Sequence, residues 1–159
     1  MLGIAPEYDE PDGDHVTIAM MAARQPHALL SESYRRVKAN LLLSAPSEEL
    51  KVILITGGLA ESGTTTAVVN LGATLASEGK RTLLVDANFH RPGLKEIFPS
   101  GSDGRGLSNV LAGQSSAPGS EDLSIAQIRY RSPDRSSILF MLTYRLTQHL
   151  AHDIIAQAH

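Results

Sequence analysis

Hydrophobic positions along the chain fall into two spacings, and each spacing predicts a different element. From residue 29 to 42, Leu and Val recur at helical intervals with charged residues between them, which predicts a helix with Ser31 as its N-cap. Residues 52–56 are instead continuous, apolar and β-branched, which is typical of a short strand buried on both faces of a parallel sheet.

A helix and a second strand are expected after this first strand. A Gly-rich turn is followed by one apolar helical face, formed by Ala67, Val68, Leu71 and Leu75. This helix should end at Gly79, and residues 81–87 are typical of a second buried strand. Strand, turn, helix and strand within about thirty-five residues form a βαβ unit, so we predict an α/β fold with a mostly parallel sheet.

Past residue 90 the pattern is weaker. Two short helices are expected at 91–98 and 106–113, and residues 136–142 are apolar enough to form a strand. Residues 114–124 have the composition of a linker, and apolar positions at helical spacing predict a final helix over 144–158.

Composition indicates an ordinary single-domain protein. Apolar residues make up 42% of 159 residues, and the net charge of −3 gives no reason to expect nucleic acid as a partner. Cysteine is absent, which excludes disulfides and thiolate metal sites. No apolar run is long enough to cross a bilayer, so we expect a cytoplasmic location. Residues 1–14 mix Pro, Gly and acids, and we predict a flexible lead-in over 1–28 before one domain over 29–159.

The Gly-rich turn, GGLAESGTTT, resembles a phosphate-binding loop without its lysine. Such a loop works because backbone N–H groups and a helix N-terminus converge on an anion, while a lysine bridges the terminal phosphates and a Ser or Thr hydroxyl binds Mg²⁺. Thr64 stands where the pattern G-x-x-x-x-G-K-[ST] has lysine, and Thr65 keeps the metal-binding hydroxyl. The candidate nucleotide contacts are Gly58, Gly63, Thr64, Thr65 and Thr66.

The missing lysine predicts weak nucleotide binding and still weaker catalysis. A hydrogen bond to a charged group contributes about 1.5–3 kcal/mol, so binding should weaken about ten- to a hundred-fold. Phosphoryl transfer should suffer more, because charge builds up on the phosphoryl oxygens in the transition state. Glu61 adds a negative charge close to the expected phosphates. Taken alone, the loop is equally compatible with a Gly-rich turn that binds nothing.

A second candidate site is the stretch LLVDANFHRP, residues 83–92. Asp86 ends the second expected strand, and the carboxyl ends of parallel strands are where open α/β proteins bind ligands. Its carboxylate could hold Mg²⁺ through water or accept a proton from a hydroxyl nucleophile. On its own, an aspartate at this place is more typical of a helix cap or a turn.

Together these motifs resemble the cytoplasmic kinase domain of bacterial tyrosine kinases (BY-kinases), which regulate capsule and exopolysaccharide synthesis. The family has PGEGKST, NLA and GK, LLVDADLRRP and GLSDVLAG, where this chain has AESGTTT, NLG and GK, LLVDANFHRP and GLSNVLAG in the same order. An upstream E-x-x-R-x-x-R helix of the family is matched by Glu32, Arg35 and Lys38. The resemblance covers residues 31–113, and residues 114–159 diverge from it.

The resemblance implies a P-loop NTPase-like, three-layer αβα fold that uses ATP and Mg²⁺ to phosphorylate protein tyrosines. Asp86 and Asn88 would be its catalytic residues, Thr65 and Asp86 would bind the metal, and Arg91 would contact the nucleotide. The subunit contacts of a homo-oligomer would be Glu32, Arg35 and Lys38, although their charge pattern alone favours a solvated face. The resemblance also implies an activating membrane protein of polysaccharide export, which would bring the chain to the inner face of the membrane.

Departures from the family point to impaired catalysis. Besides Thr64, Asn88 replaces a second carboxylate and His90 replaces an arginine. The run SSILFMLT ends without the carboxylate of a Walker B strand. The tyrosines form no cluster and are Tyr8, Tyr34, Tyr130 and Tyr144. The poor match after Gly113 leaves open a truncated or diverged chain whose core is incomplete at the C-terminus.

Two other functions stay open. The first is a non-enzymatic regulatory or assembly module, a pseudokinase that keeps the fold and the oligomer helix. The second is a ParA/MinD-like ATPase. That group carries an additional lysine early in the loop, where this chain has Leu59, which counts against it.

Overall fold

The computed structural model describes residues 1–6, 14–46, 50–57, 62–88, 91–99, 107–114, 127–128 and 138–145. Within these ranges the elements are, in chain order, α1 (His15–Ala19), α2 (Met21–Arg24), α3 (Leu29–Ser44), β1 (Val52–Gly57), α4 (Thr64–Ser77), β2 (Arg81–Asp86), α5 (Gly93–Ile97), α6 (Leu107–Leu111), β3 (Gln127–Ile128) and β4 (Ile138–Arg145). The helix expected over 144–158 lies outside the described residues, except for its first two positions, which belong to β4.

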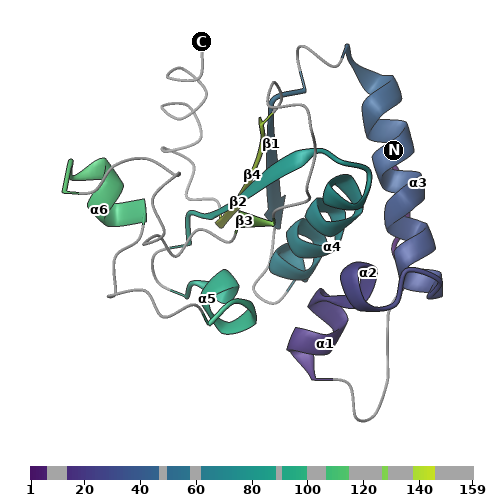
Figure 1. The fold of residues 1–159 in the computed structure, drawn as a ribbon, viewed down its shortest axis with the longest axis horizontal. Helices are drawn as coiled ribbons and strands as arrows, with labels where there is room; N and C mark the ends of the chain where they lie inside the picture. Colours follow the sequence, from purple (N-terminus) through teal and green to yellow (C-terminus); the bar gives the residue numbers. More distant parts are fainter. Residues whose placement is uncertain are drawn as a thin grey trace.

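The strands within the described ranges form one sheet in the order β1-β4-β2-β3 (Figure 1). β4 lies between β1 and β2 and runs parallel to both, whereas β3 pairs with β2 in antiparallel orientation. In this register Gly57 is opposite Arg145, and Asp86 is opposite Thr143. The carboxyl ends of the three parallel strands therefore lie at the same edge of the sheet, which is where both candidate motifs begin.

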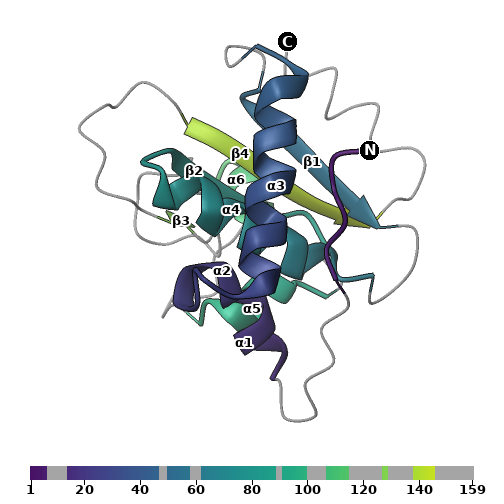
Figure 2. The same ribbon diagram turned by 90° about the vertical axis from the view of Figure 1, so that its right-hand side faces the viewer.

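Helix α4 is at the centre of the core. It contacts β1, β2 and β4 of the sheet, and it also contacts α1, α2 and α3 (Figure 2). Every residue of α4 from Val68 to Ala76 is buried. Each fully buried aliphatic side chain stabilises the fold by about 1.5–3 kcal/mol. The burial of α4 therefore holds the helices and the sheet together.

Strand β1 differs from the expectation that both of its faces are buried. Ile53 and Ile55 pack against the core, whereas Val52 and Leu54 are 49% and 38% exposed. Side chains alternate between the two faces of a strand, so the face of β1 that carries Ile53 and Ile55 lies toward the core, and the face that carries Val52 and Leu54 is more exposed. The same expectation is confirmed for β2, where residues 82–85 are all buried.

Helix α3 begins earlier than predicted, because Ser31 is not its N-cap. Ala28 occupies that position, and Ser31 lies inside the first turn with 2% of its surface exposed. The Ser31 hydroxyl donates a hydrogen bond to the carbonyl oxygen of Gln25 at 2.7 Å. Leu29 and Leu42, which the pattern grouped with the apolar face, are exposed.

Helices α1 and α2 lie in the segment that was expected to be a flexible lead-in. Ala19 and Met21 are each 1% exposed, and both helices pack against α4 (Figures 1 and 2). Isolated helices of this length are not stable in water, so packing against the rest of the chain sustains them. Residues 15–24 are therefore part of the packed fold, and the expected boundary at residue 28 differs from the structure here.

Other expected elements are present. Gly79 follows α4 with φ of 87°, the left-handed conformation that favours glycine after a helix. The short helices α5 and α6 and strand β4 lie where the sequence predicts two short helices and a strand. None of the helices in the described ranges combines the length and apolar character that a membrane span requires.

Candidate nucleotide site

The candidate phosphate loop joins β1 to α4 at the carboxyl edge of the sheet (Figure 1). β1 ends at Gly57, and α4 begins at Thr64. Residues 58–61, with the predicted contact Gly58 among them, lie outside the described residues. The structure therefore shows the two ends of this loop.

Gly63 sets the start of α4. It is the N-cap, with φ of 72° and ψ of 16°, a left-handed conformation that glycine adopts without strain. Thr64, Thr65 and Thr66 form the first turn, ahead of the first intrahelical hydrogen bond, which runs from Ala67 N to Gly63 O at 2.8 Å. The N–H groups of a first turn are the ones that bind anions at helix N-termini. The three predicted threonine contacts are thus gathered at the anion-binding end of α4.

Thr64, which replaces the loop lysine, interacts with the loop itself. Its hydroxyl lies 3.0 Å from the Ser62 hydroxyl, at hydrogen-bond distance. Both hydroxyls approach Gly57, and a Cβ atom at Gly57 would lie 2.6 Å from Thr64 Oγ1. The residue at the lysine position therefore offers a neutral hydroxyl, which lies within hydrogen-bond distance of a second one, in place of an ammonium group.

Asp86 ends β2 and holds the turn that follows. One carboxylate oxygen accepts a hydrogen bond from the backbone N of Asn88 at 2.9 Å, and the other accepts one from Leu94 N at 3.0 Å. Leu94 lies in α5 and is 1% exposed, so the carboxylate fixes α5 to the strand end. These bonds agree with the alternative interpretation of Asp86, in which it caps a helix and holds a turn. A metal-linked role is compatible with these bonds, since each carboxylate oxygen accepts more than one hydrogen bond.

Asn88 and Arg91 belong to the same turn. The Asn88 side-chain oxygen accepts a hydrogen bond from Arg91 N at 3.2 Å, which is the local bonding that places Asn in turns. Arg91 itself is exposed, and residues 89–90 lie outside the described residues.

The two candidate motifs meet where Thr65 faces Gly93. A Cβ atom at Gly93, the first residue of α5, would lie 2.7 Å from Thr65 Oγ1 and 3.0 Å from its Cγ2. Contacts this short leave no room for a side chain, so glycine allows the first turn of α4 to approach the turn that Asp86 holds. The two predicted metal ligands are thereby brought to one edge of the sheet.

Strand β4 lies beside β1 and supplies no carboxylate at this edge. Its last residues, Thr143, Tyr144 and Arg145, are in register with the ends of β2 and β1. A Walker B strand would place a metal-binding aspartate near the phosphate loop. β4, the strand paired with β1, is therefore the strand that lacks this carboxylate.

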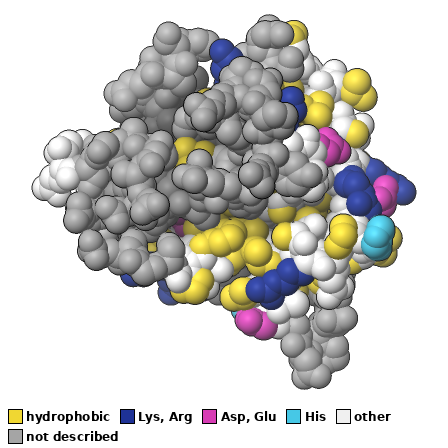
Figure 3. All heavy atoms as spheres, viewed as in Figure 1, with side chains coloured by type: hydrophobic (Ala, Val, Ile, Leu, Met, Phe, Trp, Pro, Cys, Tyr) yellow, Lys and Arg dark blue, Asp and Glu magenta, His cyan; other side chains and the backbone are white. Residues whose placement is uncertain are grey.

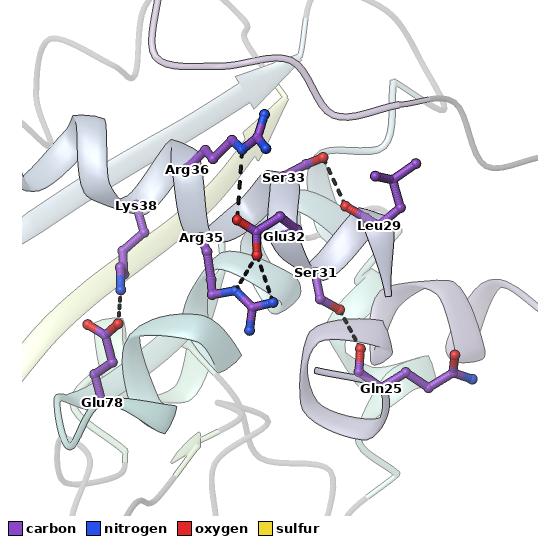
Figure 4. Close-up of polar contacts among 9 residues, drawn as sticks. All are labelled: Gln25, Leu29, Ser31, Glu32, Ser33, Arg35, Arg36, Lys38 and Glu78. Atoms are coloured by element: carbon purple, nitrogen blue, oxygen red, sulfur yellow. Dashed lines mark hydrogen bonds and ion pairs between the residues drawn. The ribbon is translucent and has the colours of Figure 1, made fainter. Parts of the chain in front are cut away.

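The charged residues of α3 that were predicted as subunit contacts differ in their surroundings (Figure 4). Arg35 donates to Glu32 at 2.8–2.9 Å, and the two side chains are 39% and 45% exposed. Basic and acidic side chains gather on the side of the molecule where α3 lies (Figure 3). Glu32 and Arg35 are therefore accessible to another molecule.

Lys38 is turned toward the inside of the chain instead. Its side chain is 9% exposed and donates to the carboxylate of Glu78 at the C-terminal end of α4 (Figure 4). Burial lowers the pKa of Lys38, and the charge of Arg35 lowers it further. In this structure Lys38 joins α3 to α4, so its predicted subunit contact would require the side chain to leave Glu78.

The residues at the sheet edge fit a nucleotide bound with Mg²⁺. Thr65 offers a hydroxyl and Asp86 a carboxylate, and Mg²⁺ prefers such oxygen donors. Within the described part of the chain, no three His, Cys, Asp or Glu side chains form a metal site of their own. The donor set therefore suits a cation that keeps several waters and takes its other ligands from phosphate oxygens.

Sequence reasoning missed several residues that shape this region. Gly57 and Gly93 give space for the hydroxyls of the loop threonines, and Ser62 bonds to Thr64. Gly93 carries a visible signal, since a glycine directly after a proline at a helix start invites a packing explanation. Asn70 carries another, because it is an amide inside the apolar stretch of α4.

A Gly-rich segment between β1 and α4, with an aspartate ending the nearby parallel strand β2, is the order of elements found in a P-loop type of α/β fold. No family model matches the chain. It is 30% identical over 104 residues to tyrosine-protein kinase YwqD of Bacillus subtilis (strain 168), which covers 65% of this chain and 44% of the relative. It is 33% identical over 89 residues to putative tyrosine-protein kinase CapB of Staphylococcus aureus, covering 55% and 38%.

A third relative is the succinoglycan biosynthesis transport protein ExoP of Rhizobium meliloti (strain 1021). It is 29% identical over 119 residues, which are 73% of this chain and 15% of the relative. The chain thus spans less than half the length of each of these curated relatives.

Solved structures show the same fold. The chimerical protein CapA2B2 superimposes with a TM-score of 0.68 at 19% identity, covering 99% of this chain and 76% of that chain. The BceF tyrosine kinase domain gives 0.65 at 22% identity, covering 91% and 71%. The resemblance to bacterial tyrosine kinases is confirmed by these comparisons: the chain is homologous to their kinase domain and has its P-loop NTPase-like fold.

Proposed function

We propose that this chain is a BY-kinase-like domain that binds ATP with Mg²⁺, acts in exopolysaccharide or capsule synthesis, and is impaired in phosphoryl transfer. The observation that carries the proposal is the approach of Thr65 to Gly93, which sets the first turn of α4 against the turn held by Asp86. The kinase names of YwqD and CapB support the activity class, and the name of ExoP supports the link to polysaccharide.

The residues present favour binding over catalysis. Bound ATP with Mg²⁺ would supply the phosphoryl group and neutralise part of its charge. The first-turn N–H groups of α4 would hold the phosphates, the Thr65 hydroxyl would bind the metal, and Asp86 would act through water. Thr64 offers only a neutral hydroxyl, which cannot offset the charge that builds up in the transition state.

The position of Tyr34 limits which tyrosine could accept a phosphoryl group. Tyr34 is 7% exposed, and burial raises the pKa of its phenol. Tyr8 and Tyr130 lie outside the described residues. Mass spectrometry after incubation with ATP and Mg²⁺ should therefore find Tyr34 unmodified, and any autophosphorylation at the other tyrosines would support an active kinase.

Partners follow from the same proposal. We infer a homo-oligomer whose contacts include the accessible Glu32 and Arg35, and an activating membrane protein of polysaccharide export. We also infer that the domain expected over 29–159, against which α1 and α2 pack, is a three-layer αβα structure whose C-terminal part differs from that of relatives.

A non-enzymatic regulatory module is the second candidate. It is favoured by the neutral hydroxyl pair of Thr64 and Ser62 and by a β4 strand without a carboxylate. Such a pseudokinase would keep the fold and the exposed charges of α3 while nucleotide binding is weak or lost.

Calorimetric titration with ATP and Mg²⁺ separates the two candidates. We expect binding heat and a thermal shift at about millimolar ATP. Thr65→Val, which removes the metal-binding hydroxyl but keeps the shape, should weaken binding several-fold. Thr74→Val is the matched control, because it removes a buried hydroxyl from the same helix, bonded to Asn70 O at 2.8 Å, away from the loop. Absence of heat and thermal shift in the parent protein would favour the regulatory module.

A further inference from the structure

Asn70 is a fully buried amide in α4 that connects three helices. Its Nδ2 donates to the carbonyl oxygens of Ile18 in α1 at 2.9 Å and of Thr66 in α4 at 3.0 Å. Its Oδ1 accepts a hydrogen bond from the backbone N of Ala22 in α2 at 2.7 Å. The side chain has 0% exposure, so these bonds replace those that water would make.

These bonds satisfy polar backbone groups for which α1 and α2 have no partner of their own. Carbonyls at the end of a helix and N–H groups at its start have no partner within that helix. Ile18 lies in the last turn of α1 and Ala22 in the first turn of α2, so Asn70 satisfies one group of each. Helices of five and four residues do not persist in isolation, and the junction between them is therefore anchored on α4.

The anchored helices touch both helices of the candidate site. α1 contacts α4 and α5, and α2 contacts α4 and α3 (Figure 2). The first turn of α4 carries Thr65, and the first turn of α5 carries Gly93 and Leu94. On the far side, the Ser31 hydroxyl of α3 donates to the carbonyl of Gln25, the C-cap of α2 (Figure 4).

We propose that α1 and α2 form a brace that holds the first turn of α4 against α5, and that Asn70 is a positioning residue for the nucleotide site. Asn70 acts through the carbonyl of Thr66, the residue that follows Thr65, and it does not touch the nucleotide. The consequence for nucleotide affinity rests on the proposed function, whereas the brace itself does not.

Two variants remove the brace from different ends. Asn70→Leu keeps the branched shape of the side chain, although leucine is larger, and removes the hydrogen bonds to the Ile18 carbonyl and from the Ala22 N–H. Met21→Ala loosens α2 from the core, since Met21 is 1% exposed, and leaves Asn70 in place. Thr74→Val is the control, since it removes a buried hydrogen bond from α4 without touching α1 or α2.

Amide hydrogen exchange is the primary readout. Ala67 N, bonded to Gly63 O, reports on the first turn of α4, and Leu94 N, bonded to Asp86, reports on α5. Both brace variants should speed exchange at these amides about ten-fold or more relative to Leu75 in the second half of α4. Thr74→Val should change all three amides by a similar factor, as a purely structural defect does.

Nucleotide affinity is the second readout. ATP affinity should fall about ten-fold in Asn70→Leu and Met21→Ala and stay near the parent value in Thr74→Val. If the parent protein binds no ATP, the proposed function fails, and the exchange pattern alone tests whether α1 and α2 brace the first turn of α4. Equal acceleration at Ala67, Leu94 and Leu75 in the brace variants, or none at Ala67 and Leu94, would overturn it. If Asn70→Leu does not fold, the milder Met21→Ala variant gives the decision.

Discussion

The hydroxyl of Thr65 lies so close to Gly93 that no side chain fits at residue 93. Thr65 comes from the first turn of α4 and Gly93 from the start of α5, and the two helices begin at the same edge of the sheet. This contact unites two motifs that are separated in the sequence by a helix and a strand. The arrangement of the candidate site depends on this contact.

Gly93→Ala tests this contact by steric means. The added methyl group would meet Thr65 Oγ1 at 2.7 Å, so we expect a loss of about 1–3 kcal/mol in the free energy of unfolding. Without the contact, the same change in a helix would stabilise the protein by about 0.4–1 kcal/mol. Urea denaturation measures the difference.

The double variant Thr65→Ala, Gly93→Ala provides the control for that prediction. Removing the Thr65 hydroxyl and methyl should relieve the collision, so Gly93→Ala should be neutral or stabilising in this background. An equal cost of Gly93→Ala in both backgrounds would show that the two residues are not in contact.

Glu78→Gln tests whether Lys38 acts inside the chain. The ammonium is nearly buried, so loss of its charged partner should lower the free energy of unfolding by about 1–3 kcal/mol. The oligomeric state should not change. Glu32→Gln is the matched control, since its pair with Arg35 is exposed and should contribute about 0–1 kcal/mol.

Denaturation and sedimentation velocity give the two readouts. A Glu78→Gln variant that dissociates an oligomer while keeping its stability would instead support the original prediction of Lys38 as a subunit contact.

Tyr34→Phe should reduce the alkaline sensitivity of the fold. Burial raises the pKa of Tyr34 above its ordinary value of 10.0, so the folded state holds the phenol proton more tightly than the unfolded state. This contribution is fully present below the unfolded pKa and is lost as pH rises toward the folded pKa. The stability of Tyr34→Phe relative to the parent should therefore rise between about pH 9 and pH 11.

The lowered pKa of Lys38 changes the stability with pH in the direction opposite to that of Tyr34. Its effect is the same in the parent protein and in Tyr34→Phe, so it cancels in this comparison. A difference in unfolding free energy that stays constant over this pH range would contradict the buried position of Tyr34.

The sequence was sufficient to predict the elements whose signals are local. β2 and α4 have continuous apolar patterns, and Gly63 and Gly79 lie at the two ends of α4 as glycines with positive φ. A glycine at such a position indicates the left-handed conformation, because few other residues adopt it. Asp86 was also placed correctly at the end of its strand.

The rest depends on partners that are distant along the chain. α1 and α2 are bonded by Asn70, which lies 48 residues after Ala22, and no local pattern encodes that distance. The exposure of Leu54 depends on which face of β1 the core covers, and residues 52–56 do not encode that choice. The inward turn of Lys38 likewise depends on Glu78 at the far end of α4.

Thr64→Lys is the most direct test of the central claim, that the first turn of α4 binds the phosphates of a nucleotide. Thr64→Met is its control, since it adds length without charge. Calorimetry with ATP and Mg²⁺ should show affinity at least several-fold higher for the lysine variant, approaching about ten- to a hundred-fold, and little change for the methionine variant. A lysine variant that binds ATP no better than the parent protein would contradict the assignment of this loop.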